Sequence, residues 1–177
     1  MKGLRHILSM TAKMAYIGVG SNLGEKLGYC LSAIDLVDRI PGCSVEDRSP
    51  FFRTEPVGVT GQDWYVNGVI SLRAEIPAQE LLNRLLAIEE GMGRERRKKW
   101  DSRCIDLDIL IFGKDIINEE DLSVPHPLMH LRRFVLAPMV LIAPDLVHPL
   151  LGKTMSKLLE DLSGNDQAVM PLENNVC

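Results

Sequence analysis

A strongly apolar segment of strand length, residues 104–112, contains two aspartates and constrains the fold more than any other feature of the sequence. Alternation along an extended strand predicts one apolar face, made by Ile105, Leu107, Ile109 and Ile111. Asp106 and Asp108 then share the opposite face, about 7 Å apart along the backbone. Two carboxylates are costly to bury without cations, so basic side chains or a hard divalent metal are expected beside them. Mg²⁺ usually takes one or two carboxylates together with substrate phosphates, so the pair suits a two-metal phosphate site. The alternative to a metal site is a strand face that is exposed to solvent or ion-paired.

Hydrophobic periodicity in the rest of the chain predicts an alternation of strands and helices. The expected strands are 15–19, 43–53, 64–75 and 104–112, with a short return strand at 116–117. The expected helices are 23–40 and 77–92, followed by a C-terminal helical extension with helices near 131–142 and 154–162. The β-α-β-β-α-β order predicts an α+β, ferredoxin-like sheet with both helices packed on one face.

The first expected helix has a single apolar stripe, made by Leu27, Cys30, Leu31, Ile34 and Val37. Ser21 or Asn22 is expected to cap its start, and the Pro-Gly pair at 41–42 ends it.

The length and charge of the chain limit its domain organisation and its partners. With 177 residues, we expect a single domain over 14–177 and a disordered N-terminal extension over 1–13. The net charge of −4 argues against nucleic-acid or membrane partners recruited by overall charge. The four cysteines show no zinc spacing, which favours a cytoplasmic protein with reduced thiols. We expect a monomer or a weak homo-oligomer.

A cluster of cations precedes the acidic strand. Arg94, Arg96, Arg97, Lys98, Lys99 and Arg103 place six cations within ten residues, with Trp100 among them. Such a run is commonly a solvated loop or a nucleic-acid patch. Beside the two aspartates, it also suits a Mg²⁺–polyphosphate ligand, because guanidinium groups bind phosphate oxygens in pairs.

Other catalytic patterns are weak. Gly18-Val19-Gly20 is a lone G-x-G, and the sequence contains no Walker A loop. His126 and His130 are spaced for zinc on a helix, but Pro127 opposes a continuous helix there. No Ser-His-Asp arrangement is recognisable, and Cys104 is better explained as a packed residue than as a catalytic thiol.

The segment Trp100-Asp101-Ser102-Arg103-Cys104-Ile105-Asp106-Leu107-Asp108-Ile109-Leu110 resembles the signature of the 6-hydroxymethyl-7,8-dihydropterin pyrophosphokinase family. Four further segments agree with the family in order and spacing. They are 15–23, Phe52-Arg53-Thr54-Glu55-Pro56, Tyr65-Val66-Asn67 and Val124-Pro125-His126-Pro127. The resemblance spans roughly 14–165.

The resemblance implies transfer of the pyrophosphoryl group of ATP to the pterin hydroxymethyl group, with release of AMP, in folate biosynthesis. It implies that Asp106 and Asp108 bind two Mg²⁺ ions and act in catalysis with Arg94 and Arg103. The implied ATP contacts are Glu89, Arg94, Arg103, His126 and Arg132. The implied pterin pocket comprises Thr54, Val57, Tyr65, Asn67, Trp100 and Phe134, with Trp100 and Phe134 on the two faces of the ring.

The sequence departs from the family pattern at three places. Asp101 stands where a small residue is usual, and the 94–99 stretch is about one residue shorter than in some members. Pro127 cannot supply an aromatic contact after His126. Two other functions remain open at this stage, a two-metal phosphohydrolase and a ferredoxin-like RNA-binding module. The scarcity of aromatic residues, 5% of the chain, counts against the RNA-binding module.

Overall fold

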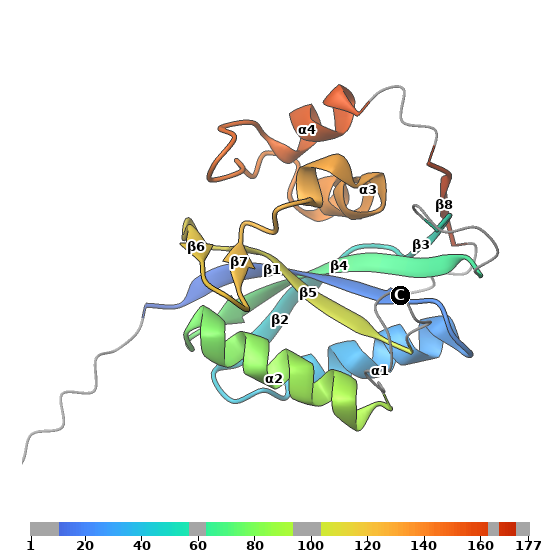
Figure 1. Ribbon diagram of the computed structural model, residues 1–177, viewed down its shortest axis with the longest axis horizontal. Coiled ribbons are helices and arrows are strands. Elements are labelled where there is room, and N and C mark those ends of the chain that lie inside the picture. The colour runs from blue at the N-terminus through green and yellow to red at the C-terminus, as the bar shows by residue number, and fades with distance from the viewer. Residues whose placement is uncertain (1–10, 57–62, 94–103, 163–166, 173–177) are drawn as a thin grey trace, which may run out of the picture.

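The computed structural model describes residues 11–56, 63–93, 104–162 and 167–172, which form an antiparallel sheet between two layers of helices (Figure 1). The strands of the main sheet are β1 (Lys13–Ser21), β2 (Cys43–Arg48), β3 (Phe52–Thr54), β4 (Tyr65–Ala74), β5 (Asp106–Phe112) and β8 (Val169–Pro171). Their order is β5-β1-β4-β3-β8, and β2 also pairs with β4. A separate ribbon joins β6 (Ile117–Asn118) to β7 (Ser123–Val124).

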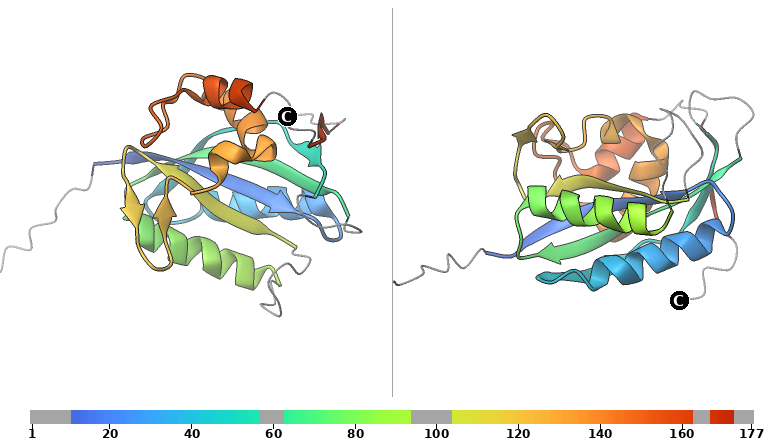
Figure 2. Two further views of the ribbon diagram at one scale, coloured as in Figure 1. Left: turned by 45° about the horizontal axis from the view of Figure 1, so that its top comes forward. Right: turned by 60° about the horizontal axis from the view of Figure 1, so that its bottom comes forward.

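The helices lie in two layers, one on each face of the sheet (Figures 1 and 2). One layer holds α1 (Lys26–Asp38) and α2 (Ala78–Gly91), which lie side by side. The other holds α3 (Arg133–Ile142), which the short 3-10 helix η1 (Met129–Leu131) precedes, and α4 (Met155–Asp161). The predicted ferredoxin-like α+β fold with a C-terminal helical extension is confirmed. None of the helices in the described part of the chain is long and apolar enough to cross a membrane.

Each layer of helices closes its own apolar core. Side chains of β1 alternate between the cores, because Ile17 and Val19 face α1 and α2 while Tyr16 packs against the α3 side. The central strand β4 is buried on both faces over most of its length, but only its face towards α1 and α2 is continuously apolar. The sheet therefore lies between two cores, and a polar side chain on it needs a partner or an opening.

The alternation predicted for β5 fails in its second half. Its pairing with β1 skips Leu110, because Ile109 and Ile111 face consecutive residues of β1. An extra residue of this kind is a β-bulge, which turns the following side chains to the other face. Ile111 therefore packs in the core under α3 and α4, and the prediction that it shares a face with Ile109 is wrong.

The start of α1 also differs from the prediction. β1 continues to Ser21 through its pairing with β4, and the helix begins only at Lys26, without a side-chain cap. Ser21 and Asn22 are buried at the end of the strand, so the prediction that either caps the helix is wrong. Leu31, predicted to be buried, is 40% exposed.

The strand predicted over 43–53 is divided into β2 and β3. Between them, the Ser49 backbone N–H donates to Val69 O at 2.8 Å, and the Ser49 hydroxyl accepts from Val69 N at 3.0 Å. Pro50 has no N–H to continue the ladder. The break lets both short strands pair with β4 while the chain changes course between them.

Candidate active site

A row of three residues, two of them predicted site residues, crosses three strands on the α3 side of the sheet. Asn67 of β4 pairs in register with Gly20 of β1, and Gly20 pairs with Asp106 of β5. Leu107 belongs to the core under α1 and α2. Asp106 and Asp108, on either side of it, therefore share the opposite face, as the alternation predicts.

The two carboxylates lie at the edge of the main sheet. Asp106 is half-buried and Asp108 is exposed, so neither is sealed inside the protein. Within residues 11–56, 63–93, 104–162 and 167–172, no three His, Cys, Asp or Glu side chains gather closely enough to hold a metal ion. A cation at Asp106 and Asp108 would take its other ligands from a substrate or water, which is the usual coordination of Mg²⁺ in phosphate-transfer sites. The residues present therefore fit that ion.

Thr54 and Asn67 form a buried polar pair next to this row. The Asn67 amide Nδ2 donates to Thr54 Oγ1 at 2.6 Å, and the two residues are only 9% and 1% exposed. Thr54 also pairs in register with the half-buried Tyr65. The structure thus brings together three of the residues predicted to contact the pterin, at the end of the sheet where Asp106 lies.

His126 lies close to Asp108 and to Arg132. Its backbone N–H donates to Leu110 O at 2.8 Å, which fixes the loop against β5. Its ring Nδ1 accepts from Leu128 N at 3.1 Å, so the neutral ring carries its proton on Nε2. Burial lowers the pKa of His126, Asp108 raises it, and Arg132 lowers it. The ring is therefore a neutral hydrogen-bond donor near pH 7, suited to a phosphate oxygen.

Arg132 and Phe134 stand at the start of α3. The Arg132 guanidinium carbon lies 5.6 Å from the centre of the Phe134 ring, within the range of a cation–π contact. Phe134 is partly buried against the core under α3. Arg132, which is predicted to contact phosphate, therefore lies next to Phe134, which is predicted to contact the pterin.

Glu89 reaches the acidic strand from the opposite layer. It is 2% exposed on α2, and its Oε1 accepts from the backbone N–H of Leu107 at 2.7 Å. Leu107 stands between Asp106 and Asp108, so Glu89 holds the backbone that carries both carboxylates. Its predicted contact with ATP stays a prediction.

Four predicted site residues lie outside the described residues. They are Val57, Arg94, Trp100 and Arg103. The remaining predicted residues come from β3, β4, α2, β5 and the segment from His126 to the start of α3. Because these elements are far apart in the sequence, only the sheet and the layer above it bring them together.

Sequence reasoning missed the contribution of Gly20. The lone G-x-G at residues 18–20 is a weak signal for a phosphate-binding loop. In the structure it lies inside a strand, and Gly20 separates Asn67 from Asp106. The predicted strand ends at residue 19, one residue before Gly20, so no signal in the sequence places Gly20 on its polar face.

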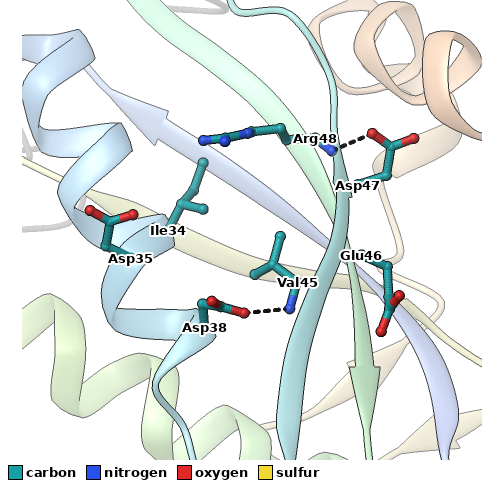
Figure 3. Close-up of a pocket in the computed structure, with 7 residues that line it drawn as sticks. All are labelled: Ile34, Asp35, Asp38, Val45, Glu46, Asp47 and Arg48. Carbon is teal, nitrogen blue, oxygen red and sulfur yellow. Dashed lines mark hydrogen bonds between the residues drawn. The ribbon is translucent and has the colours of Figure 1, made fainter. Parts of the chain in front are cut away.

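A hollow of about 260 Å³ lies between α1 and β2, away from the row described above (Figure 3). Asp35, Asp38, Glu46 and Asp47 make most of its rim acidic. Asp38 Oδ1 accepts from Val45 N at 2.8 Å, which ties its carboxylate to the strand. No predicted site residue lines this hollow.

Solved structures share this architecture. Wild-type Plasmodium falciparum HPPK-DHPS matches with a TM-score of 0.72 at 15% identity, over 88% of this chain and 44% of that chain. At this level of identity the likeness concerns the fold. The fold is thus of the class found in HPPK-containing proteins.

The sequence comparisons identify the family. The model of the 7,8-dihydro-6-hydroxymethylpterin-pyrophosphokinase (HPPK) family matches residues 16–144. The 2-amino-4-hydroxy-6-hydroxymethyldihydropteridine pyrophosphokinase of Methylorubrum extorquens is 38% identical over 84% of this chain and 92% of the relative. The protein of the same name from Synechocystis sp. is 40% identical over 84% of this chain and 75% of the relative.

The chain belongs to the 7,8-dihydro-6-hydroxymethylpterin-pyrophosphokinase family. The resemblance stated from the sequence is therefore confirmed. So is the predicted activity, pyrophosphoryl transfer from ATP to hydroxymethyldihydropterin in folate synthesis.

Proposed function

We propose that the reaction depends on Mg²⁺, and that Asp106 and Asp108 hold two such ions together with the phosphates of ATP. The observation that carries this proposal is the row in which two carboxylates on one face of β5 stand beside Asn67, with Gly20 between. Bound Mg²⁺ would neutralise the polyphosphate and leave the β-phosphorus more open to attack. The remaining steps are assigned to side chains of the chain itself.

The phosphate chain of ATP is assigned to cationic and neutral donors around these carboxylates. His126 donates from Nε2, and Arg132 supplies a guanidinium that binds phosphate oxygens in pairs. Glu89, an acceptor and not one of these donors, is assigned to the nucleotide side from the resemblance, while Arg94 and Arg103 are assigned the same role as Arg132. These donors counter the negative charge that would otherwise repel the attacking alcohol.

The pterin is assigned to the opposite end of the row. Thr54 and Asn67 offer a hydroxyl and an amide to the polar edge of the ring. Tyr65 and Phe134 supply aromatic surface, and Val57 and Trp100 are assigned from the sequence. A ring held at this end points its hydroxymethyl group along the row towards Asp106. The arrangement favours transfer through positioning, because both reactants are held in one orientation.

In the transfer, the alcohol oxygen forms a bond to the β-phosphorus of ATP. The bond from the β-phosphorus to the oxygen that bridges it to the α-phosphate breaks, and AMP leaves with that electron pair. The alcohol proton is released. The alcohol that accepts the pyrophosphoryl group must compete with water for the β-phosphorus. The aromatic and amide side chains assigned to the pterin suit an acceptor with a planar heterocycle.

The test is release of AMP from ATP by the purified protein, with and without 6-hydroxymethyl-7,8-dihydropterin. We expect AMP only when both the pterin and Mg²⁺ are present, and loss of turnover with excess chelator that returning Mg²⁺ restores. ATP hydrolysis without pterin would favour the two-metal hydrolase. Turnover unaffected by a chelator would contradict the metal assignment, and salt-sensitive RNA binding without turnover would favour the RNA-binding module.

We also propose a cytoplasmic location and a monomer or weak homo-oligomer that acts on small molecules and not on nucleic acid. The thiols of Cys30, Cys43 and Cys104 are free, which suits a reducing compartment. Burial raises the pKa of the Cys30 thiol to about 12, so this group is unreactive near neutral pH. Sedimentation at micromolar concentration tests the oligomeric state.

A further inference from the structure

We infer that Gly20 is a positioning residue for the pterin: its missing side chain lets the Asn67 amide lie over β1, in line with Asp106. The inference rests on the proposed roles of Asn67 and Asp106. It adds a residue that touches no substrate in this scheme and acts through Asn67.

The space above Gly20 is already filled by the Asn67 side chain. A Cβ on Gly20 would lie 2.4 Å from Asn67 Oδ1 and 3.6 Å from Asn67 Cγ. A distance of 2.4 Å is well inside the contact distance of carbon and oxygen, so an alanine at this position would force the amide to move.

The amide has little freedom to move. Its Nδ2 donates to Thr54 Oγ1 at 2.6 Å, and both residues are almost completely buried. Rotating the amide away from position 20 would break that hydrogen bond and leave a buried donor without its partner. The position of Oδ1 over Gly20 is therefore set from two sides, by Thr54 and by the backbone of β1.

The backbone conformation does not itself require glycine at this position. Among the residues that the structure describes, the glycines with positive φ angles are Gly24, Gly42, Gly93, Gly113 and Gly152. Gly20 is an ordinary strand residue paired on both sides, with Asn67 and with Asp106. Since a side chain would suit the backbone, the requirement for glycine comes from the space above it.

Gly18 provides a matched comparison on the same strand and the same face. A Cβ on Gly18 would meet only Leu110 side-chain atoms, at 3.6 to 3.7 Å, which is ordinary van der Waals contact. Alanine therefore fits at Gly18 without displacing a neighbour. The two glycines therefore differ in whether an added Cβ would displace a neighbouring side chain, which is the property that the inference uses.

The geometry predicts a selective defect in pterin binding. Neighbouring strands lie about 4.8 Å apart, so Asn67 and Asp106 face each other across roughly 10 Å of strand β1. A pterin whose polar edge is read by Asn67 reaches towards Asp106 across Gly20. Moving the amide shifts the ring without touching the groups assigned to ATP.

The experiment compares Gly20→Ala with Gly18→Ala in the full chain. The readouts are calorimetric binding of the pterin, with Mg²⁺ and a non-hydrolysable ATP analogue present, and separate KM values for pterin and ATP. We expect Gly20→Ala to weaken pterin binding about ten-fold, the loss of one buried hydrogen bond, with little change for ATP. Gly18→Ala should stay within about two-fold of the unmodified chain for both substrates.

A cycle with Asn67→Ser separates positioning from general damage to the strand. Serine lacks the Oδ1 atom that the new Cβ would meet, so adding Gly20→Ala to Asn67→Ser should cost no further pterin affinity. If Gly20→Ala alone does not fold, the comparison of Asn67→Ser with the double variant still decides. A further loss in the double variant, or equal losses for Gly18→Ala and Gly20→Ala, would overturn the inference.

Failure of this inference is distinguishable from failure of the proposed function. Pterin-dependent AMP release by the unmodified chain tests the function first. If that activity is present and Gly20→Ala binds pterin normally, only the role of Gly20 is wrong.

Discussion

The two faces of the main sheet are built for different purposes. The face under α1 and α2 is a continuous apolar core to which β1, β4 and β5 all contribute. The face under α3 and α4 is apolar only in part, because Asn67, Gly20 and Asp106 form a polar row at one end. Since one face supplies a large share of the apolar burial, the other can leave costly polar groups in place for chemistry.

Glu89 connects the two faces. It belongs to α2 on the packed side, yet its carboxylate accepts a hydrogen bond from the backbone of the strand that carries both aspartates. A buried carboxylate at this position is explained by its effect on β5: it satisfies a backbone donor at the sheet edge. The packed face therefore supports the geometry of the chemical face.

The largest effect on activity is expected at the two aspartates. Asp106→Asn or Asp108→Asn should lower pterin-dependent AMP release at least about 100-fold, because a carboxylate that holds charge in the transition state is lost. The melting temperature should stay within a few degrees, since neither side chain is fully buried. Asp35→Asn, an exposed carboxylate on α1, is the control and should keep full activity. Near-normal turnover of either site variant would contradict the metal assignment.

Substitutions on the packed face, under α1 and α2, should lower the stability of the protein and leave its KM values unchanged. Leu85→Ala removes a fully buried side chain of α2 from the core under α1 and α2, and the free energy of unfolding should fall by about 3 kcal/mol. Below the melting temperature the KM values should remain normal. Leu36→Ala, at a half-exposed position of α1, should cost less than about 1 kcal/mol. Urea unfolding measures both, and a pterin-specific defect in Leu85→Ala would contradict the division between the faces.

Thr54→Val tests the polar pair directly. Valine keeps the shape of threonine but offers no acceptor to Asn67 Nδ2, which lies at 2.6 Å from the hydroxyl oxygen. Pterin affinity should fall about ten-fold, with a smaller change for ATP. Thr154→Val is the matched control, because Thr154 caps α4 and its loss should affect only stability, by about 1 kcal/mol. Equal losses for pterin and ATP in Thr54→Val would argue against a pterin-reading role.

The smallest effect is expected beside α4, where His148 makes the region sensitive to acid. Its Nδ1 accepts from Leu150 N and Leu151 N, both at 3.3 Å, and its ring lies 6.1 Å from that of His130. Burial lowers the pKa of His148, and His130 lowers it further. The unfolded chain therefore binds this proton more readily than the folded chain, so stability is complete above about pH 6.5 and falls as the pH drops below it.

His148→Asn should reduce this acid dependence, because asparagine can still accept from the backbone but does not ionise. His130→Asn, the control, should reduce it less, because burial is the larger cause of the shift. The measurement is the free energy of unfolding between pH 5 and pH 7.5. An unchanged pH slope in His148→Asn would remove His148 from this role.

Much of the site could be predicted from the sequence, because its strongest signals are local. Asp106 and Asp108 alternate with apolar neighbours, and this pattern alone placed both carboxylates on one face of a strand. The α2 helix follows from its own apolar spacing after Pro77. Thr54, Asn67 and Phe134 have no such local signal, and only the resemblance to a family points to them. The prolines around His126 indicate a loop histidine, structural or in contact with phosphate.

What the tertiary structure decided depends on neighbours distant in the sequence. The bulge at Leu110, the division of β2 from β3 and the late start of α1 all follow from strand pairing. The need for glycine at position 20 arises because Asn67, 47 residues away by their numbers, fills the space above it. Periodicity along a chain shows which face a residue prefers, whereas pairing across a sheet determines which side chain it meets there.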